Sequence, residues 1–195
     1  MSGTIVVAEL SANHQHDQDI AADTIRAIAD TGADAVKLQT YTADTLTLNS
    51  DRPEFLAATS GTIWEGRNLH DLYKEAYTPW EWHAELKEVA ESVGLTLFSS
   101  PFDKSAVDFL EELDVPMYKI ASFEITDIPL IEYTASKGRP VIISTGVADA
   151  GDIQMAVDAC RRFGNDNITL LQCTSSYPAP VELANLRMIP SLAST

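Results

Sequence analysis

Two lysines and several hydroxyl side chains lie at or just beyond the ends of short apolar runs in this chain of 195 residues. Ammonium and hydroxyl groups bind phosphate and carboxylate oxygens through charge-assisted hydrogen bonds. If the runs are neighbouring strands, Lys37 and Lys119 predict a cationic cradle for such an anion. The alternative is that each lysine only pairs with a nearby carboxylate, such as Glu9 or Glu124. The hydroxyl groups of the predicted cradle come from Ser100, Ser122, Ser144 and Ser175.

Further polar side chains end the same apolar runs. Glu124 can act as a general acid or base if it is removed from water, or it can merely pair with Lys119. Gln39 and Tyr177 stand at equivalent positions and have groups that hydrogen-bond to a polar substrate. The sequence therefore predicts a polar ring around the anion cradle.

The histidines and cysteines give a weaker signal. His14 follows Asn13 just past the first apolar run, and it is either a metal ligand or a hydrogen-bonded loop histidine. His70 and His83 lie in or near helical segments and are expected at the surface. Cys173 directly follows an apolar run, which places it at the rim of the site or buries it as a small apolar side chain. No metal ligand is assigned within the sequence.

The apolar runs themselves predict the fold. Each is continuous rather than alternating, as in strands that are buried on both faces of a parallel sheet, and helical segments separate them. Six such runs occur in the order of the chain: 4–8, 35–38, 95–98, 116–120, 140–143 and 168–171. The repeated strand and helix pattern is that of βα units.

Three helices have recognisable ends. Thr78, Pro79 and Glu81 predict a capping box with proline at the first helical position, and the helix should run to about Ser92. Asp103 is expected to cap the next helix. Residues 153–164 carry an apolar stripe followed by arginines and a glycine, which is typical of a helix and its C-terminal end. The long segment 41–77 between the second and third runs is expected to be functional or mobile.

Buried parallel strands fit either an open doubly wound sheet or a (β/α)8 barrel. The glycine-rich phosphate fingerprint of a dinucleotide site is missing after the first run, where residues 8–14 read AELSANH. A barrel of this kind usually needs about 250 residues. The expected fold is therefore an α/β (β/α)8 TIM barrel truncated after about six βα units, with residues 1–195 as one incomplete domain. In such a barrel, Lys37 and Lys119 should face one cavity with the serines around them.

Composition limits the partners of the chain. It has 13 basic and 29 acidic side chains and a net charge of −16, which disfavours nucleic acid or an anionic membrane as the main partner. It contains no apolar run of membrane-spanning length and no leading apolar segment. With only two cysteines, we expect a cytoplasmic protein with free thiols.

Six ordered motifs carry a resemblance to a known family. The chain resembles the sialic acid synthase family, whose members condense phosphoenolpyruvate with an amino-sugar aldehyde. The segments similar to its pseudaminic acid synthase branch are 64–69 (WEGRNL), 73–80 (YKEAYTPW) and 121–124 (ASFE). In place of residues 121–124, N-acetylneuraminate synthases usually have GSGE. The six motifs are AELSANH (8–14), KLQT (37–40), SSPFD (99–103), YKIASFE (118–124), ISTG (143–146) and CTSSYP (173–178).

The resemblance implies a role for each candidate residue. Lys37 and Lys119 would bind phosphoenolpyruvate, and Glu9 would support the site from the first strand. Glu124 would lie near the reacting aldehyde, on the sugar side with Gln39 and Tyr177. The hydroxyl partners of phosphoenolpyruvate would be Ser100, Ser122, Ser144 and Ser175, although neuraminate enzymes more often have Asn at the last of these.

The resemblance also implies parts that these residues lack. The family holds a divalent metal ion, Mn²⁺ or Mg²⁺, with histidines on later barrel strands, so its ligands are expected beyond residue 195. A small antifreeze-like domain closes the partner subunit's site in a homodimer. The expected activity of the whole enzyme is synthesis of pseudaminic acid, a cell-surface sugar, from a 2,4-diacetamido-2,4,6-trideoxy sugar aldehyde. This chain alone is expected to be inactive.

Three other interpretations remain open. The protein could be an N-acetylneuraminate or legionaminate synthase, which differs in the sugar consumed. It could be a Schiff-base aldolase in which Lys119 is the nucleophile. It could also be a non-catalytic fragment, because an incomplete barrel leaves two sheet edges exposed.

Overall fold

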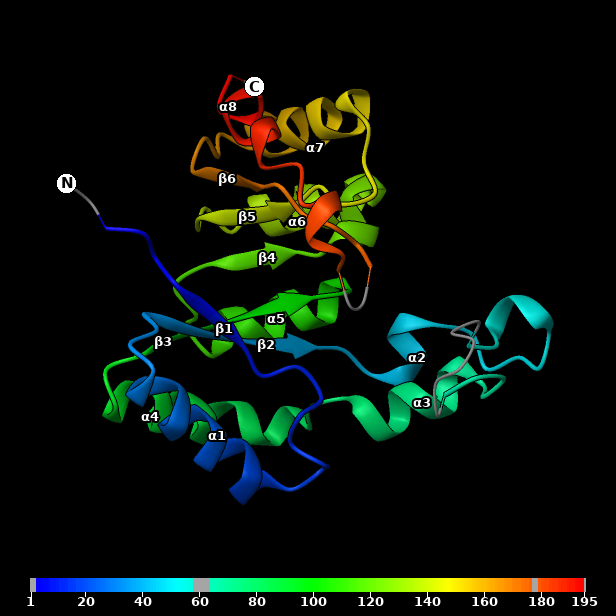
Figure 1. Ribbon diagram of the computed structural model, residues 1–195, viewed down its shortest axis with the longest axis vertical. Helices are drawn as coiled ribbons and strands as arrows, with labels where there is room; N and C mark the ends of the chain where they lie inside the picture. The colour runs from blue at the N-terminus through cyan, green and yellow to red at the C-terminus, as the bar shows by residue number, and fades with distance from the viewer. Residues whose placement is uncertain (1–2, 58–63, 177–178, 195) are drawn as a thin grey trace. The chain divides into compact units, whose positions relative to one another are not determined.

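The computed structural model describes residues 3–57, 64–176 and 179–194 and is drawn in Figure 1. The chain divides into two compact units, Met1–Phe98 and Ser99–Thr195, and the strand β3 (Thr96–Pro101) is shared between them. Each unit contains parallel strands that alternate with helices. None of the helices in the described residues has the length and apolar character needed to cross a membrane.

The first unit begins with two short parallel strands. β1 (Val7–Glu9) pairs with β2 (Ala35–Thr40), and the register places Glu9 opposite Lys37. The helices α1 (Gln18–Asp30) and α4 (His83–Ser92) pack against each other. A core with Leu10, Ile25, Leu38, Leu86 and Leu97 at its centre fixes these elements.

The segment that follows β2 is the predicted long connection, and it contains several short helices. α2 (Ala43–Leu46) begins two residues after Tyr41, beyond the C-terminal tip of β2 in Figure 1. The 3-10 helix η1 (Pro53–Phe55) and α3 (Leu69–Ala76) complete it, and the 3-10 helix η2 (Trp80–Trp82) follows it. The Asn68 side chain caps α3 and also donates a 2.9 Å hydrogen bond to the carbonyl of Ser50. The connection is therefore ordered structure on both sides of residues 58–63.

The second unit contains β4 (Tyr118–Ile120), β5 (Val141–Ser144) and β6 (Ile168–Leu171), all parallel to the end of β3. Its larger helices are α5 (Lys104–Glu112), α6 (Ile128–Ala135) and α7 (Ala150–Arg162), and η3 (Ser122–Thr126) follows β4 directly. Three short helices end the unit: η4 (Val181–Leu183), η5 (Leu186–Met188) and α8 (Ile189–Leu192). Tyr118, Ile120, Ile131 and Ile143 are fully buried in its core.

Strand order separates the two expected architectures. The strands run β1-β2-β3 in the first unit and β3-β4-β5-β6 in the second, always in the order of the chain. A doubly wound sheet instead has a point where the order reverses. The described strands of either unit show no such reversal, so the strand order is that of consecutive barrel units.

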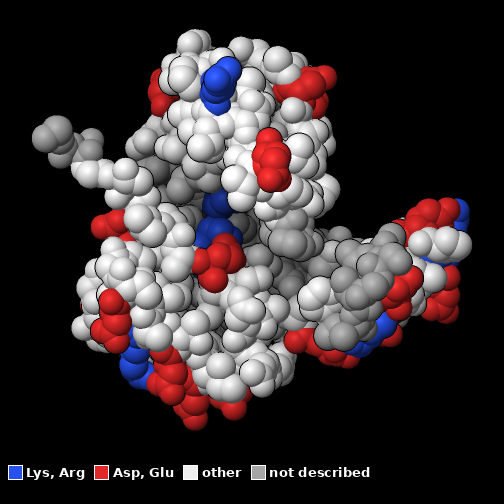
Figure 2. Space-filling model, viewed as in Figure 1, with Lys and Arg blue, Asp and Glu red and all other residues white. Residues whose placement is uncertain are grey.

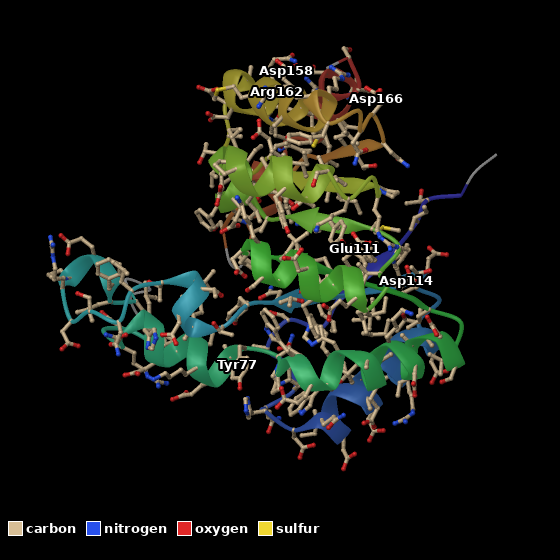
Figure 3. All side chains as sticks on the ribbon, turned by 180° about the vertical axis from the view of Figure 1, so that it is seen from behind. Tyr77, Glu111, Asp114, Asp158, Arg162 and Asp166 are labelled. Atoms are coloured by element: carbon tan, nitrogen blue, oxygen red, sulfur yellow. The ribbon has the colours of Figure 1, made fainter. Side chains whose placement is uncertain are left out.

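Charged side chains hold the N-terminal ends of the strands in the second unit. Arg139, just before β5, donates to Glu111 at 2.7 Å and to Asp114 at 2.8 Å. Figure 3 shows both carboxylates near the C-terminal end of α5. This end of a βα unit is ordinarily concerned with stability, which leaves the opposite strand ends for ligands.

Most predicted elements are confirmed, with some changes in their bounds. Asp103 caps α5 by accepting hydrogen bonds from the backbone of Ser105 and Ala106, as predicted. The first strand is shorter than expected, because residues 4–6 are exposed and lie outside it. The capping box at Thr78 is wrong: its hydroxyl bonds to the buried His14 ring, and α4 begins only after η2. The predicted end of that helix at Ser92 is confirmed.

Candidate functional site

Lys119 and Ser144 form the centre of the site in the second unit. Lys119 Nζ, on β4, donates a hydrogen bond of 2.6 Å to Ser144 Oγ at the end of β5. The register of the two parallel strands pairs Lys119 with Ile142, so Ser144 lies one pleat further toward the C-terminal ends. A cation and a hydroxyl from neighbouring strands are thus brought together, as the sequence predicts. The pair is partly buried, which strengthens its interaction with an anion.

Gly146 lies where hydroxyls from two further strand ends meet. Its backbone N–H donates to Ser122 Oγ at 3.3 Å. A Cβ at this position would collide with Ser175 Oγ and would lie 3.0 Å from Ser122 Oγ and 3.1 Å from Cys173 Cβ. A Cβ at position 146 would therefore force the Ser175 hydroxyl to move, and this lack of space, rather than a positive φ, favours glycine there. This role was not predicted from the sequence, although Ser144-Thr145-Gly146 at the end of a strand was a signal for it.

Glu124 is a carboxyl group that is partly removed from water. It lies in η3, and its Oε2 atom is buried without a hydrogen-bond partner among the described residues. Burial raises the pKa of Glu124 and is the largest effect. A hydrogen bond from its own backbone N–H lowers the pKa, Asp127 raises it, and Lys119 lowers it by the smallest amount. The carboxyl group is thus shifted toward its protonated form. This environment favours the acid or base interpretation over a simple ion pair with Lys119.

In the first unit, Lys37 is held by Glu9. Lys37 is only 7% exposed, and its Nζ atom lies 2.5 Å from Glu9 Oε2. The other carboxylate oxygen of Glu9 accepts hydrogen bonds from Ser11 N at 3.2 Å and from Gln39 Nε2 at 3.5 Å. The ion pair of Lys37 with Glu9 that the sequence allowed is therefore present, and the binding of an anion by Lys37 stays a prediction. Glu9 balances the charge that a buried lysine needs and orients two candidate residues at once.

His14 is a hydrogen-bonded loop histidine. It is fully buried, and its Nδ1 atom accepts a hydrogen bond of 3.0 Å from the backbone of His16. The proton must then lie on Nε2, which is 3.3 Å from Thr78 Oγ1. Burial lowers the pKa of His14, and His16 lowers it further. Both ring nitrogens are occupied, so the alternative that His14 binds a metal is not supported.

The expectation that His70 and His83 lie at the surface is wrong. His83 is fully buried between Thr40 Oγ1, 3.0 Å from Nε2, and the carbonyl of Pro79, 3.2 Å from Nδ1. Burial lowers its pKa to about 4, so the ring is neutral. His70 is 2% exposed, and its Nε2 atom lies 2.7 Å from Asp44 Oδ1. Their partners are distant in the sequence, so local pattern did not reveal the burial.

The remaining candidate residues differ in their burial and in the unit to which they belong. Ser100 is buried at the end of β3. Cys173 is partly buried beside Gly146, and Cys160 is fully buried in α7, where burial raises its pKa to about 11. Tyr177 lies outside the described residues. Glu9, Lys37 and Gln39 belong to the first unit and the other described candidates to the second, so the convergence of Lys37 and Lys119 on one anion stays a prediction.

Metal ligands do not gather in the part of the chain that the structure describes. Across residues 3–57, 64–176 and 179–194, no group of three or more His, Cys, Asp or Glu side chains could hold a metal ion.

The face of the molecule drawn in Figure 2 is acidic: it shows groups of Asp and Glu, and Lys and Arg form no broad patch there. On this face, an anion would have to bind in a local pocket rather than on a broad basic surface.

The relatives of this chain among known proteins agree on one family. The NeuB family model matches residues 24–195. The chain is 51% identical over 181 residues to pseudaminic acid synthase of Helicobacter pylori, covering 93% of this chain and 53% of that protein. It is 43% identical over 187 residues to pseudaminic acid synthase of Campylobacter jejuni, covering 96% and 54%. The chain thus spans about half the length of the curated relatives it matches.

A solved structure supports the same assignment. The crystal structure of N-acetylneuraminic acid (sialic acid) synthetase from Leptospira borgpetersenii in complex with citrate matches with a TM-score of 0.83 and 32% identity. The match covers 99% of this chain and 62% of that one. The predicted fold class, the first six βα units of a (β/α)8 TIM barrel, is confirmed by this likeness together with the parallel strands. The resemblance predicted from the six motifs is confirmed as well.

Proposed function

The chain belongs to the NeuB family, and we propose that the protein it is part of condenses phosphoenolpyruvate with an amino-sugar aldehyde to give pseudaminic acid and phosphate. One observation carries the proposal. Lys119 and Ser144 are hydrogen-bonded at the ends of adjacent strands, beside the hydroxyls that meet at Gly146 and near a carboxyl group with a raised pKa. The condensation needs a site that binds the anionic phosphoenolpyruvate and a group that donates a proton.

The second unit would bind phosphoenolpyruvate. The Lys119 ammonium supplies positive charge, and Ser122, Ser144 and Ser175 supply hydroxyl donors for phosphate or carboxylate oxygens. Gly146 leaves the space in which these hydroxyls approach one another. Ser100 would add a fourth hydroxyl from the end of β3. Hydroxyls from several strands fix the orientation of the bound anion, which brings its reacting carbon to one defined place.

Glu124 would act on the aldehyde. C3 of phosphoenolpyruvate forms a bond to the aldehyde carbon, and the aldehyde oxygen needs a proton as it becomes a hydroxyl. A carboxyl group that burial holds toward its protonated form can donate that proton. Water then adds at C2 of the former phosphoenolpyruvate, and phosphate leaves from the tetrahedral intermediate. We therefore assign Glu124 the role of general acid.

The first unit would complete the site. Lys37 would be a second cation for phosphoenolpyruvate, and its ion pair with Glu9 holds it in place. The Gln39 amide would hydrogen-bond to the sugar, as would the Tyr177 hydroxyl. In a barrel, the C-terminal ends of all strands open into one mouth, which would bring these residues to the same substrates.

A divalent metal ion, Mn²⁺ or Mg²⁺, is also part of the proposed enzyme. Its chemistry would be to polarise the aldehyde oxygen as a Lewis acid. The described residues do not fit this ion, because they bring together no three ligating side chains. The ligands would belong to the part of the relatives' length that this chain does not span, and no step above depends on them. The cytoplasm as location and a homodimer as assembly are further parts of the proposal.

The test is an assay of phosphate release by the full-length protein with phosphoenolpyruvate and Mn²⁺. We expect faster release with the 2,4-diacetamido-2,4,6-trideoxy sugar aldehyde than with N-acetylmannosamine. Preference for N-acetylmannosamine, or for the legionaminic acid precursor, would contradict the pseudaminic assignment. Borohydride trapping of pyruvate on Lys119 would instead reveal a Schiff-base aldolase.

A further inference from the structure

Two large apolar side chains are exposed directly beyond the ends of β4 and β5. Phe123 is 72% exposed and Val147 is 49% exposed. Phe123 follows Ser122 and Val147 follows Gly146, and these two residues are joined by the hydrogen bond from Gly146 N to Ser122 Oγ. The two apolar side chains are therefore borne by neighbouring strand ends within the second unit.

Single exposed apolar side chains are common on protein surfaces, so exposure alone does not indicate a function for Phe123 and Val147. Their position beside the candidate site does. Ser122 and Glu124 flank Phe123 in η3, and Lys119 and Ser144 lie on the strands that lead to the two residues. Loops at the C-terminal ends of barrel strands line the substrate site. The candidate site, which is otherwise polar, would therefore have an apolar side formed by Phe123 and Val147.

We propose that Phe123 and Val147 contact the C6 methyl group of a 6-deoxy sugar aldehyde and thereby select it over the 6-hydroxy sugar. This inference rests on the proposed function and names the part of the substrate that the two side chains recognise. Glu124, the residue assigned to the aldehyde at C1, directly follows Phe123 in η3, so this short helix would bear both the group that acts at C1 and the apolar side chain that contacts C6.

The chemistry of the substrate selects the methyl group from its other parts. Each acetamido group has an N–H and a carbonyl that need hydrogen-bond partners, and the Phe and Val side chains supply none. The C6 methyl has no polar atom, so contact with Phe123 and Val147 leaves nothing unpaired. A hydroxyl at C6 would lose its hydrogen bonds to water against the same surface.

The experiment compares two aldehydes that differ only in the 6-hydroxyl group, using the full-length protein. The ratio of kcat/KM for the 6-deoxy to the 6-hydroxy aldehyde is measured for the unmodified protein, for Phe123→Ala and for Val147→Thr. We expect Phe123→Ala to lower this ratio about tenfold, the usual contribution of one small apolar contact to selectivity. Val147→Thr keeps the shape of the side chain and should shift the ratio in the same direction. The KM for phosphoenolpyruvate should stay the same in both.

Phe163→Ala is the matched control, because Phe163 is a 52% exposed phenylalanine that follows α7 on the other side of βα unit five. Its ratio should equal that of the unmodified protein. An unchanged ratio in both Phe123→Ala and Val147→Thr, with turnover retained, would overturn this inference and leave the proposed function standing. Absence of phosphate release by the unmodified protein with either aldehyde would overturn the proposed function and this inference with it.

Discussion

Lys119 Nζ and Ser144 Oγ lie 2.6 Å apart, on adjacent parallel strands, so the ammonium group is already directed by a hydroxyl before any anion binds. A lysine has four rotatable side-chain bonds, and fixing its ammonium group in advance reduces the entropy lost on binding. The contact joins β4 to β5 at the ends of the strands, where ligands of barrel proteins bind. Three predictions concern this contact and its surroundings, and a fourth concerns His83 in the first unit.

Replacement of Lys119 by Met should weaken phosphoenolpyruvate binding. Hydrogen bonds to charged groups contribute about 1.5 to 3 kcal/mol, so the KM for phosphoenolpyruvate should rise by roughly 10- to 100-fold. Ser144→Ala should have a smaller effect in the same direction. Lys137→Met is the control, because Lys137, just after α6 in the same unit, pairs with Asp108 of α5 at 2.8 Å. An equal rise in the control would show that the effect is structural.

Replacement of Gly146 by Ala should displace the hydroxyls of Ser122 and Ser175. The added Cβ would overlap with Ser175 Oγ, so the Ser175 side chain or the segment after β6 must move. Phosphoenolpyruvate affinity should fall, and measurement by isothermal titration calorimetry gives the size of the loss. Gly3→Ala is the control, because a Cβ at Gly3 has no atom within 4 Å. Unchanged affinity in Gly146→Ala would refute the close approach of these hydroxyls.

Replacement of Glu124 by Gln should reduce kcat and at the same time stabilise the protein above neutral pH. Loss of a general acid should slow turnover by roughly 100-fold or more. Burial raises the pKa of Glu124 in the folded state, so its contribution to stability is present at low pH and is lost as pH rises through that pKa. Gln does not titrate and avoids this loss.

The measurement for this variant is the melting temperature at a series of pH values. The unmodified protein and Glu124→Gln should agree near pH 4, and the variant should melt higher at pH 8. Asp127→Asn serves as a comparison, because Asp127 adds to the raised pKa of Glu124. A variant that melts lower than the unmodified protein across the whole range would contradict the assignment of Glu124 as a partly desolvated carboxyl.

Acid should destabilise the first unit through His83. Burial lowers its pKa to about 4, whereas an unfolded histidine titrates near 6.5. The stability that the neutral ring contributes is therefore complete above about pH 6.5 and is lost as pH falls toward 4. His83→Gln should make the melting temperature fall less steeply over this range. Equal slopes for His83→Gln and the unmodified protein would refute the prediction.

Local sequence pattern was enough for the strands and for some helix ends. Continuous apolar runs separated by helical segments are typical of strands in a parallel sheet, so the runs predicted six strands. Their bounds differ from those predicted, and β1 and β6 are more exposed than strands buried on both faces. The cap of α5 was predictable because Asp103 bonds to backbone groups two and three residues away. Such contacts depend on neighbours in the chain, and the sequence contains those neighbours.

The tertiary structure decided what depends on distant partners. Thr78 has the sequence of a helix cap, but its hydroxyl bonds to the His14 ring, 64 residues away. His83 is buried because Thr40, 43 residues away, satisfies its ring. The need for glycine at position 146 comes from Ser122 and Ser175 on the flanking strand ends, and the raised pKa of Glu124 comes mainly from burial. The sequence determined which residue types reach the strand ends; space, burial and the pairing of polar atoms were set only when the chain folded, because these depend on atoms that are far apart along it.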